Sequence, residues 1–594
     1  MRRIPLLIIA LGVAAFAGWY YWKVSLQISS APVSELLPQR TIFLAYLPDF
    51  NRTRDEWHHC DIYQLYREPA VQDFLRPGIA GLSHLSKTNS AAQRLQEIEQ
   101  LDPKHAFLAL TAIDNNNPRF VGGFRFHGSR ENAERVISRW RSTVLEQTPG
   151  AKREKRQYQR HEIELITAAP FTLATTYDGP WFFAATDLAE LEEVLDRADR
   201  RAKNPEDTLD KDQGYRAAVA HRSSNYAAFF YLQPKIFSER LAALRAAVRS
   251  SPAPGESTML EKMRCIAAST RFENGKIHDV LFLGMPKLEH NVTLTRSSMS
   301  LGTKETFFYL SMLLNLGERI DTLNQVAAFA DAKIFQALAD SGVTADDWKA
   351  AFGLELGSLG DWPSGAHWPS LLLTLPIVDA AKAEKIVETI IGADETATWT
   401  QTETDGIRYF SKQSAASLVA ITPTIGLSDR ILLAGFNPVS VEEAMKRSGA
   451  SSSELSSSQT YKAASQLLPA PTNFFAYIDM ALLYSRLDAS LRPMLLMAAA
   501  FMPAVAGSVD ATKLPSPETI TRHLSPIVSS QRYDRDGYVA ESVGPITLDQ
   551  SAIGLAILSS LGTGAGQKAG AAVTGWGASP TATPQPTLSP SPTP

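Results

Sequence analysis

The chain has only two cysteines among its 594 residues, Cys60 and Cys265. At most one disulfide can therefore form within the chain. In an oxidising compartment these two residues could pair, and the alternative is two separate buried thiols. The spacing between them does not decide between the two.

The chain also lacks an excess of charge of one sign. It carries 58 Lys and Arg against 62 Asp and Glu, a net charge of -4. Such a balance provides no electrostatic argument for nucleic acid, and we expect none as a partner. The one basic run, Lys152–Arg156, includes a Glu and is predicted to be a solvated loop or helix face rather than a phosphate site.

No nucleophile elbow, His-Glu-x-x-His pair or Walker A loop occurs in the sequence. The stretch Gly564–Ala569 formally fits a dinucleotide-binding pattern. It follows no clear strand and leaves no room for a βαβ unit, so a flexible linker is the better interpretation.

Three other groups of polar residues have side chains that could form a site. His58–Asp61 is the only cluster of metal-ligand residue types, but a site needs about three protein ligands and the others cannot be named. Two acid pairs recur in the matching helices, Glu192-Glu193 and Glu442-Glu443. Adjacent residues of a helix point about 100° apart, which favours a solvated face over a facing acid pair. His523 is predicted to cap a helix or to form a hydrogen bond. We therefore predict no catalytic, cofactor-binding or metal-binding residue, and no cofactor.

One long hydrophobic run is present, at Ile4–Trp22, directly after Arg2 and Arg3. As a helix it would span about 28 Å, close to the core of a bilayer. The arginines predict a cytoplasmic N-terminus, with the body of the chain exported and Trp19–Trp22 at the interface. Cleavage after Ala17 is the competing interpretation. We expect a single-pass anchor in the inner membrane, with the body on the periplasmic side.

A strand-turn-helix pattern occurs twice, at Ala184–Leu195 and, about 250 residues later, at Ala434–Met445. Asp187 and Asn437 are natural N-caps for the two helices. Other matches follow in the same order, including Ala133–Ile137 with Ala383–Val387, Tyr215 with Tyr461, Tyr231 with Tyr477, and Ala268–Phe272 with Ser529–Tyr533. A repeat of this length is a duplicated domain and not a solenoid unit.

The predicted fold class is α+β, with two duplicated domains of mostly antiparallel sheets and packed helices after an N-terminal transmembrane helix. Hairpin signals such as Asn274-Gly275 favour antiparallel pairing. Thr306–Leu314 is ambiguous between strand and helix, and Met494–Gly507 is predicted to pack in a core. The expected units are residues 1–34 as anchor, 35–290 as repeat 1, 291–548 as repeat 2, and 549–594 as a short helix and disordered tail.

Several of these stretches are similar to those of an uncharacterised bacterial envelope family, domain of unknown function 3352. They include the opening from Leu37-Pro38 to Tyr46-Leu47, the helix with Leu191-Glu192-Glu193, the strands at Tyr231 and Tyr477, and the later Thr521–Pro526 and Glu541–Pro545. The resemblance covers residues 35–548. It implies an exported, membrane-tethered protein and carries over no catalytic residue.

The expected function is binding or scaffolding in the cell envelope, with the membrane and an envelope protein or lipid as partners. A groove between the two halves, lined by apolar side chains from both, is the predicted site. The alternative is an envelope hydrolase or metal-dependent enzyme whose residues are distant in sequence.

Overall fold

The computed structural model describes residues 31–76, 96–114, 117–148, 150–168, 171–239, 262–287, 292–314, 341–393, 398–412, 421–450, 452–501 and 513–550. The predicted membrane anchor lies outside these residues except for positions 31–34, and so do Gly564–Ala569 and the C-terminal tail. Among the helices of the described part, none combines the length and the apolar character that crossing a bilayer requires.

The fold is α+β and is built on one 20-stranded antiparallel sheet. The strands of what we call the first half are β1 (Phe43–Asp49), β2 (Lys104–Asp114), β3 (Asn117–Arg125), β4 (Lys152–Tyr158), β5 (His161–Ala168), β6 (Phe171–Asp178), β7 (Trp181–Ala185), β8 (Ala228–Leu232), β9 (Cys265–Glu273) and β10 (Lys276–Gly284). Those of the second half are β11 (Thr306–Leu313), β12 (Glu355–Asp361), β13 (Ser370–Pro376), β14 (Trp399–Thr404), β15 (Ile407–Lys412), β16 (Thr424–Leu427), β17 (Ile431–Gly435), β18 (Phe474–Ile478), β19 (Ile527–Asp534) and β20 (Gly537–Gly544).

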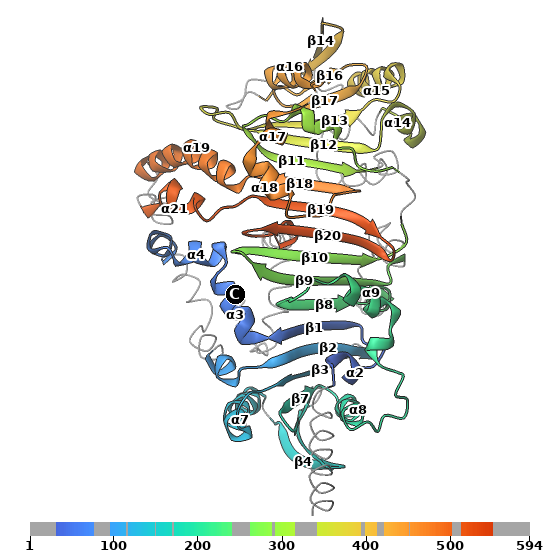
Figure 1. The fold of residues 1–594 in the computed structure, drawn as a ribbon, viewed down its shortest axis with the longest axis vertical. Coiled ribbons are helices and arrows are strands. Elements are labelled where there is room, and N and C mark those ends of the chain that lie inside the picture. Colours follow the sequence, from blue (N-terminus) through green and yellow to red (C-terminus); the bar gives the residue numbers. More distant parts are fainter. Residues whose placement is uncertain are drawn as a thin grey trace, which may run out of the picture.

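The strand order is the same in both halves. From the outer edge inward the first half runs β4-β5-β6-β7-β3-β2-β1-β8-β9-β10. The second half runs β14-β15-β16-β17-β13-β12-β11-β18-β19-β20. Figure 1 shows the strands stacked along the long axis, with β4 near one end and β14 near the other.

The two halves meet where β10 pairs antiparallel with β20. One sheet therefore runs through the whole molecule, whereas the sequence predicted separate sheets in two domains. Counted from the hairpin turns before β10 and β20, Val280 and Glu541 hold the same position in their strands, and they are also register partners. A pseudo-two-fold axis thus passes between these two residues, as in an isologous dimer interface.

Helices cover both faces of the sheet. In the first half they are α2 (Val33–Leu36), α3 (Phe50–His58), α4 (Asp61–Arg67), α7 (Arg130–Gln147), α8 (Leu188–Ala198), the 3-10 turn η1 (Leu209–Lys211) and α9 (Gln213–His221). In the second half they are the 3-10 helix η2 (Ser297–Leu301), α14 (Ala345–Ala351), α15 (Ala380–Ala393), α16 (Pro438–Arg447), α17 (Glu454–Ser457), α18 (Gln459–Ser465), α19 (Met480–Phe501) and α21 (Pro517–Thr521).

Successive strand residues show how the helices divide between the faces, because neighbours along a strand point to opposite sides. In β7, Phe183 belongs to the core under α8, whereas Phe182 belongs to the core under α7. In β17, Leu433 packs with α16 and Leu432 packs against the core of α15. Each half therefore has two cores, one on each side of the sheet.

Local sequence explains where the repeated strand-turn-helix units turn. Asp187 accepts hydrogen bonds from the amides of Ala189 and Glu190 at the start of α8. Asn437 accepts from Val439 N at the start of α16, with Pro438 in the first turn. The predicted hairpin at Asn274-Gly275 is also confirmed, and both residues have the positive φ values, 52° and 79°, of a two-residue turn.

Four sequence expectations are resolved or corrected by these elements. Thr306–Leu314 is strand β11. Lys152–Arg156 is neither loop nor helix but the exposed edge strand β4, whose charges discourage pairing with another chain. Cys60 and Cys265 are two separate buried thiols. The prediction that Met494–Met497 packs in a core is wrong: these side chains are exposed near the end of α19, which lies beside the sheet (Figure 1).

Candidate functional site

The residues weighed for chemistry in the sequence have ordinary structural partners. His58 stacks on Tyr63 with ring centroids 4.4 Å apart, and His59 Nδ1 lies 2.7 Å from the carbonyl oxygen of Asp55. The hydrogen-bonding role predicted for His523 is confirmed, since its Nε2 lies 2.7 Å from Glu68 Oε1.

A cluster that the sequence analysis missed is His161, Asp178 and Asp199, whose potential ligand atoms lie within 4.8 Å of one another. His161 Nε2 is 3.0 Å from Asp199 Oδ2. Arg160 Nη2 lies 2.5 Å from Asp199 and 3.0 Å from Asp178, and Arg201 Nη1 lies 2.7 Å from Asp199. Because guanidinium groups already neutralise both carboxylates, we interpret the cluster as an ion-pair network that fastens β5, β6 and the end of α8 together.

The junction between the halves differs from the predicted apolar groove. His278 Nε2 lies 3.1 Å from Glu541 Oε2 across the β10–β20 pair, and Arg532 donates to the other oxygen of Glu541 at 2.5 Å. Arg271 approaches His278 Nδ1 at 2.8 Å from β9. The predicted apolar groove between the halves is therefore not found at this junction, because strand pairing joins the two halves and polar side chains lie across it.

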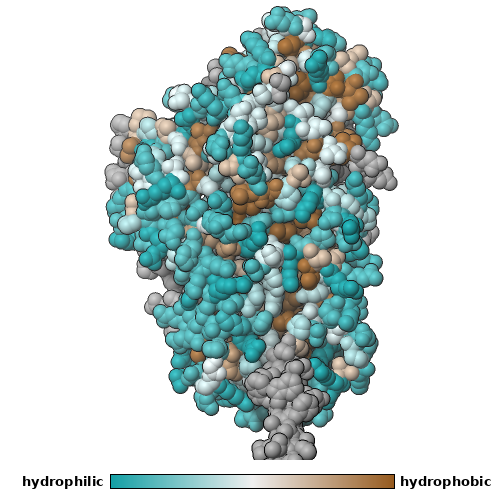
Figure 2. All heavy atoms as spheres, in the orientation of Figure 1, coloured by the Kyte–Doolittle hydropathy of each residue, from teal (hydrophilic) through white to brown (hydrophobic). Residues whose placement is uncertain are grey.

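The best candidate for a binding site is an open pocket in the second half, with a volume of about 720 Å³. We call it the second-half pocket. Its lining includes four large apolar side chains that are 46–60% exposed: Trp368, Ile421, Phe436 and Val439. Figure 2 shows that hydrophobic residues on the face it draws are gathered in limited areas of a mostly hydrophilic surface. Large apolar side chains grouped around a hollow are typical of ligand sites.

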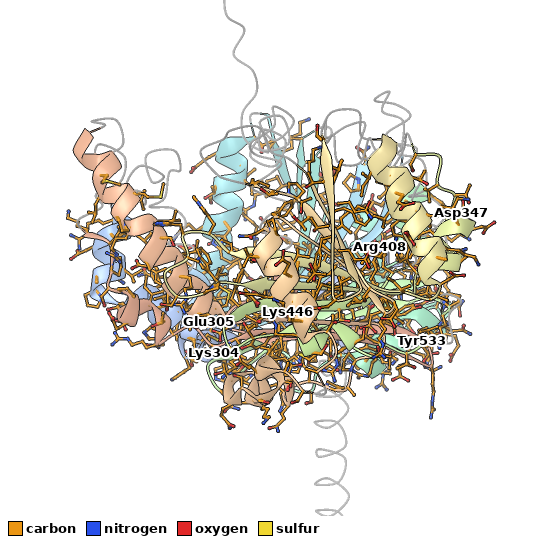
Figure 3. The ribbon with its side chains drawn as sticks, turned by 90° about the horizontal axis from the view of Figure 1, so that it is seen from above. Lys304, Glu305, Asp347, Arg408, Lys446 and Tyr533 are labelled. Carbon is orange, nitrogen blue, oxygen red and sulfur yellow. The ribbon has the colours of Figure 1, made fainter. Side chains whose placement is uncertain are left out.

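The floor and rim of the second-half pocket are polar. Asp361, at the end of β12, accepts a hydrogen bond of 2.5 Å from Thr306 Oγ1 and lies 3.6 Å from Arg447. Burial raises the pKa of Asp361, although the Thr306 hydroxyl and Arg447 partly counteract this. Figure 3 shows Lys304 and Glu305 next to each other and close to α16. The site therefore combines an apolar wall with fixed charges.

Two local features hold the pocket open. The long connection from β12 to β13 carries Trp368, and Trp362 anchors it by donating its indole N–H to the Ala366 carbonyl at 3.0 Å. Gly360, next to the last residue of β12, packs closely on Phe307: an added Cβ would meet its ring at 2.8 Å, so glycine is required for this close approach. On the opposite side, the Asn437 cap turns the chain into α16 directly after Phe436.

The same place in the first half is closed by ion pairs. Arg40 Nη2 lies 3.0 Å from both Glu190 and Glu193, and Arg119 lies 3.7 Å from Glu190. Strand register shows which residues of the second half stand at these positions. Glu305 stands at the position of Arg40. Ser370 replaces Arg119, and Ser440 replaces Glu190. These three replacements abolish the ion pairs, and the space that they fill in the first half becomes the pocket.

No lining residue of the second-half pocket was predicted to bind a ligand, and Asn437 was singled out in the sequence only as a helix cap. A usable signal was present, because the β12–β13 connection is longer than the β2–β3 turn and contains Trp362 and Trp368. The exchange of Arg119 for Ser370 was a second signal, but it becomes visible only when the registers of the two halves are known.

Comparisons with known proteins add no identification. No family model matches the chain, and none of the curated proteins matches it. Three crystal forms of TP0453 are similar to part of it, with 7% sequence identity. Forms III and I have TM-scores of 0.23 over 44% of this chain and 82% of theirs. Form IV has a TM-score of 0.24 over 43% and 80%. These scores are too low to indicate a shared fold.

Proposed function

We propose that this protein is a binding protein. Its second-half pocket takes a ligand that carries a positive charge next to an apolar or aromatic group. The observation that carries the proposal is the set of four exposed apolar side chains around a pocket of about 720 Å³. Its counterpart in the first half is closed by ion pairs, so the common fold does not require an opening here. Burying these side chains against a ligand would remove apolar surface from water at about 25 cal/mol per Å².

The charges of the lining support a cationic ligand. The acids that line the second-half pocket outnumber the bases: they are Glu305, Asp361, Glu443 and Glu454, against Lys304 and Arg447. Three of these acids have partners. Asp361 is held by Thr306 and Arg447. Glu305 binds Arg486 at 2.5 Å, and Glu454 accepts from the Lys304 amide at 3.0 Å. Glu443 is exposed and stands where Glu193 meets Arg40 in the first half.

We further propose that the chain is an internally duplicated, membrane-anchored protein of the cell envelope, with its body on the exported side. The repeated strand order supports the duplication. The apolar run after Arg2-Arg3 supports the anchor. The resemblance to domain of unknown function 3352 supports the envelope address and remains an expectation.

The binding proposal can be tested on the full-length protein with two probes of similar shape and opposite charge, 2-phenylethylamine and phenylacetate. Saturation-transfer NMR should show stronger binding of the amine. Phe436→Ser, in the pocket wall, should weaken it about threefold to tenfold. Val378→Ser is the matched control, because Val378 is 68% exposed and does not line the pocket.

Equal binding of both probes, or equal effects of the two substitutions, would contradict the proposal. Glu443→Gln should reduce the preference for the amine without changing stability, since this carboxylate is exposed. A hydrolytic activity that survives Phe436→Ser would instead favour the alternative of an enzyme with a site elsewhere.

A further inference from the structure

Two charged side chains of the second-half pocket have no ion-pair partner in the protein. Lys304, in the turn before β11, and Glu443, on α16, are both exposed and both line the pocket. In the part of the chain that the structure describes, neither side chain forms an ion pair or a hydrogen bond, with the other or with a third residue. One free cation and one free anion therefore face the same space.

The other acids and the other base of the lining already have partners. Glu305 lies 2.5 Å from Arg486, and Arg447 lies 3.6 Å from Asp361. Glu454 accepts a hydrogen bond from a backbone amide at 3.0 Å. A ligand that bound these groups would have to compete with existing contacts, whereas the two free groups can be bound without breaking any.

The first half shows that charges carried by the same two elements meet at this place. There Arg40, in the turn before β1, lies 3.0 Å from Glu193 of α8. Glu443 stands at the position of Glu193, but Glu305 stands at the position of Arg40. The cation of the second half comes one residue earlier, where the first half has Gln39. Both halves thus bring opposite charges to this place, and in the first half they pair directly.

The apolar wall of the pocket comes from other elements. Trp368 lies on the β12–β13 connection and Phe436 directly follows β17, and both rings are half exposed. Exposed aromatic faces of this kind stack on a ring or pack against an apolar chain. The pocket volume of about 720 Å³ lies within the range of about 300–1,000 Å³ that is usual for small-molecule sites. The pocket therefore offers a ligand three surfaces: a cation, an anion and an apolar wall.

We propose that the ligand of the second-half pocket is a small zwitterion with an aromatic or large apolar side chain, of the class of the aromatic α-amino acids. This inference rests on the proposed function and adds a negative group to the ligand. The ammonium group binds Glu443, the carboxylate binds Lys304, and the side chain packs against Trp368 and Phe436. Each charge of the ligand then meets the opposite charge, whereas an amine without a carboxylate would leave Lys304 unpaired.

Four probes built on one carbon skeleton separate the charges of the ligand. Phenylalanine is 2-phenylethylamine with an added carboxylate. Phenylalaninamide replaces this carboxylate by an uncharged amide, and 3-phenylpropionate keeps it but lacks the ammonium group. NMR titrations of the full-length protein at low salt should show that phenylalanine binds about twofold to fivefold more tightly than phenylalaninamide, the gain of one exposed ion pair. The gain should disappear at about 1 M salt, where charges are screened beyond about 3 Å.

Substitutions of the two free groups assign the charges. Lys304→Gln should abolish the preference for phenylalanine over phenylalaninamide without weakening phenylalaninamide, and Lys304→Arg should keep the preference because it keeps the charge. Glu443→Gln should weaken both of these probes and leave 3-phenylpropionate unaffected. Lys446→Gln is the matched control for the loss of one exposed positive charge, because Lys446 lies on α16 but does not line the pocket (Figure 3). It should not change the preference.

Equal binding of phenylalanine and phenylalaninamide, or a preference that survives Lys304→Gln, would overturn this inference. The proposed function would still stand in that case, provided that 2-phenylethylamine binds better than phenylacetate. If no amine binds, both fail. The inference is also overturned if soluble dihexanoyl phosphatidylethanolamine binds where phenylalanine does not, since the zwitterion would then be a lipid headgroup.

Discussion

Val280 and Glu541 face each other across the β10–β20 pair and hold the same position in the two halves. One is apolar and the other acidic, so the centre of the pseudo-symmetry is chemically asymmetric. His278 and Arg532 compensate the acid, with contacts of 3.1 and 2.5 Å to its two oxygens. The stability of the junction should therefore depend on the ionisation of Glu541.

Glu541→Gln should lower the free energy of unfolding at pH 7 by about 1–3 kcal/mol, because it removes a charge-assisted pair from a largely buried site. Burial raises the pKa of Glu541, but hydrogen bonds from His278 and Arg532 outweigh it and hold the pKa below its ordinary value of 4.5. A depressed pKa contributes stability that is present above the unfolded value and is lost as pH falls through the folded one. Urea unfolding at pH 7 and at acidic pH should show that the unfolding free energies of the unchanged protein and of Glu541→Gln converge below pH 4.5. A difference between them that stays constant with pH would contradict this.

Asp549 should behave in the opposite way. Burial, and secondarily the charge of Asp279, raise the pKa of Asp549 from 3.8 to about 6. The folded state then binds the proton more tightly, so this residue lowers stability as pH rises from 3.8 through about 6. Asp549→Asn should stabilise the protein at pH 7.5 by about 1–3 kcal/mol and have little effect near pH 4. Thermal melts across this range, with Asp536→Asn as a control whose side chain is 48% exposed, should show that only Asp549→Asn has a pH-dependent effect.

Closing the second-half pocket should be achievable by restoring the ion pair of the first half. Ser370→Arg combined with Ser440→Glu recreates the Arg119–Glu190 pair at the matching register. We expect binding of 2-phenylethylamine to fall about tenfold, with unfolding free energy unchanged within about 1 kcal/mol. A double-mutant cycle on both quantities measures the coupling of the two residues. Unchanged binding by the folded double variant would show that the ligand does not occupy this place.

The two thiols should be unreactive in the folded protein. Burial raises the pKa of both Cys60 and Cys265 to about 11, which leaves almost no thiolate at pH 7. A thiol reagent should therefore titrate both groups only after denaturation, and a reductant should not shift the melting temperature. Detection of one intramolecular disulfide in the oxidised protein would contradict the structure, in which the two residues are free.

The parts of the fold that follow local chemistry were predictable from the sequence. Asp187 and Asn437 mark helix starts because their side chains cap backbone amides a few residues away, and Asn274-Gly275 marks a hairpin because its backbone must take positive φ. Pairing of β10 with β20 was not predictable, because the two strands lie far apart in the sequence. Nothing in the sequence of either strand specifies which other strand edge it pairs with. The exposure of Met494–Met497 was also missed, since an apolar run does not reveal whether anything lies opposite it.

The site was less predictable for a related reason. The ends of β12 and β17 and the connection that carries Trp368 come together only in the folded sheet, and each alone has the composition of an ordinary turn. The charged cluster around His161 likewise joins residues from β5, β6 and the end of α8. Matching positions of the two halves have to be compared to find the site. Residues that both halves share serve the fold, whereas a difference such as Arg119 against Ser370 marks the proposed pocket.

The β10–β20 pair has a consequence for how such a molecule can be divided. A chain that stopped after β10 would present seven consecutive register positions, from Ile277 to Leu283, as an unsatisfied strand edge. Because the matching strand of the other half is its natural mate, two such fragments would join in the same register and rebuild the axis between two copies of Val280. Joining the halves in one chain makes this association intramolecular, with an effective concentration set by the linker and not by expression level. The two halves are accordingly arranged like the subunits of a homodimer whose interface is closed within one chain.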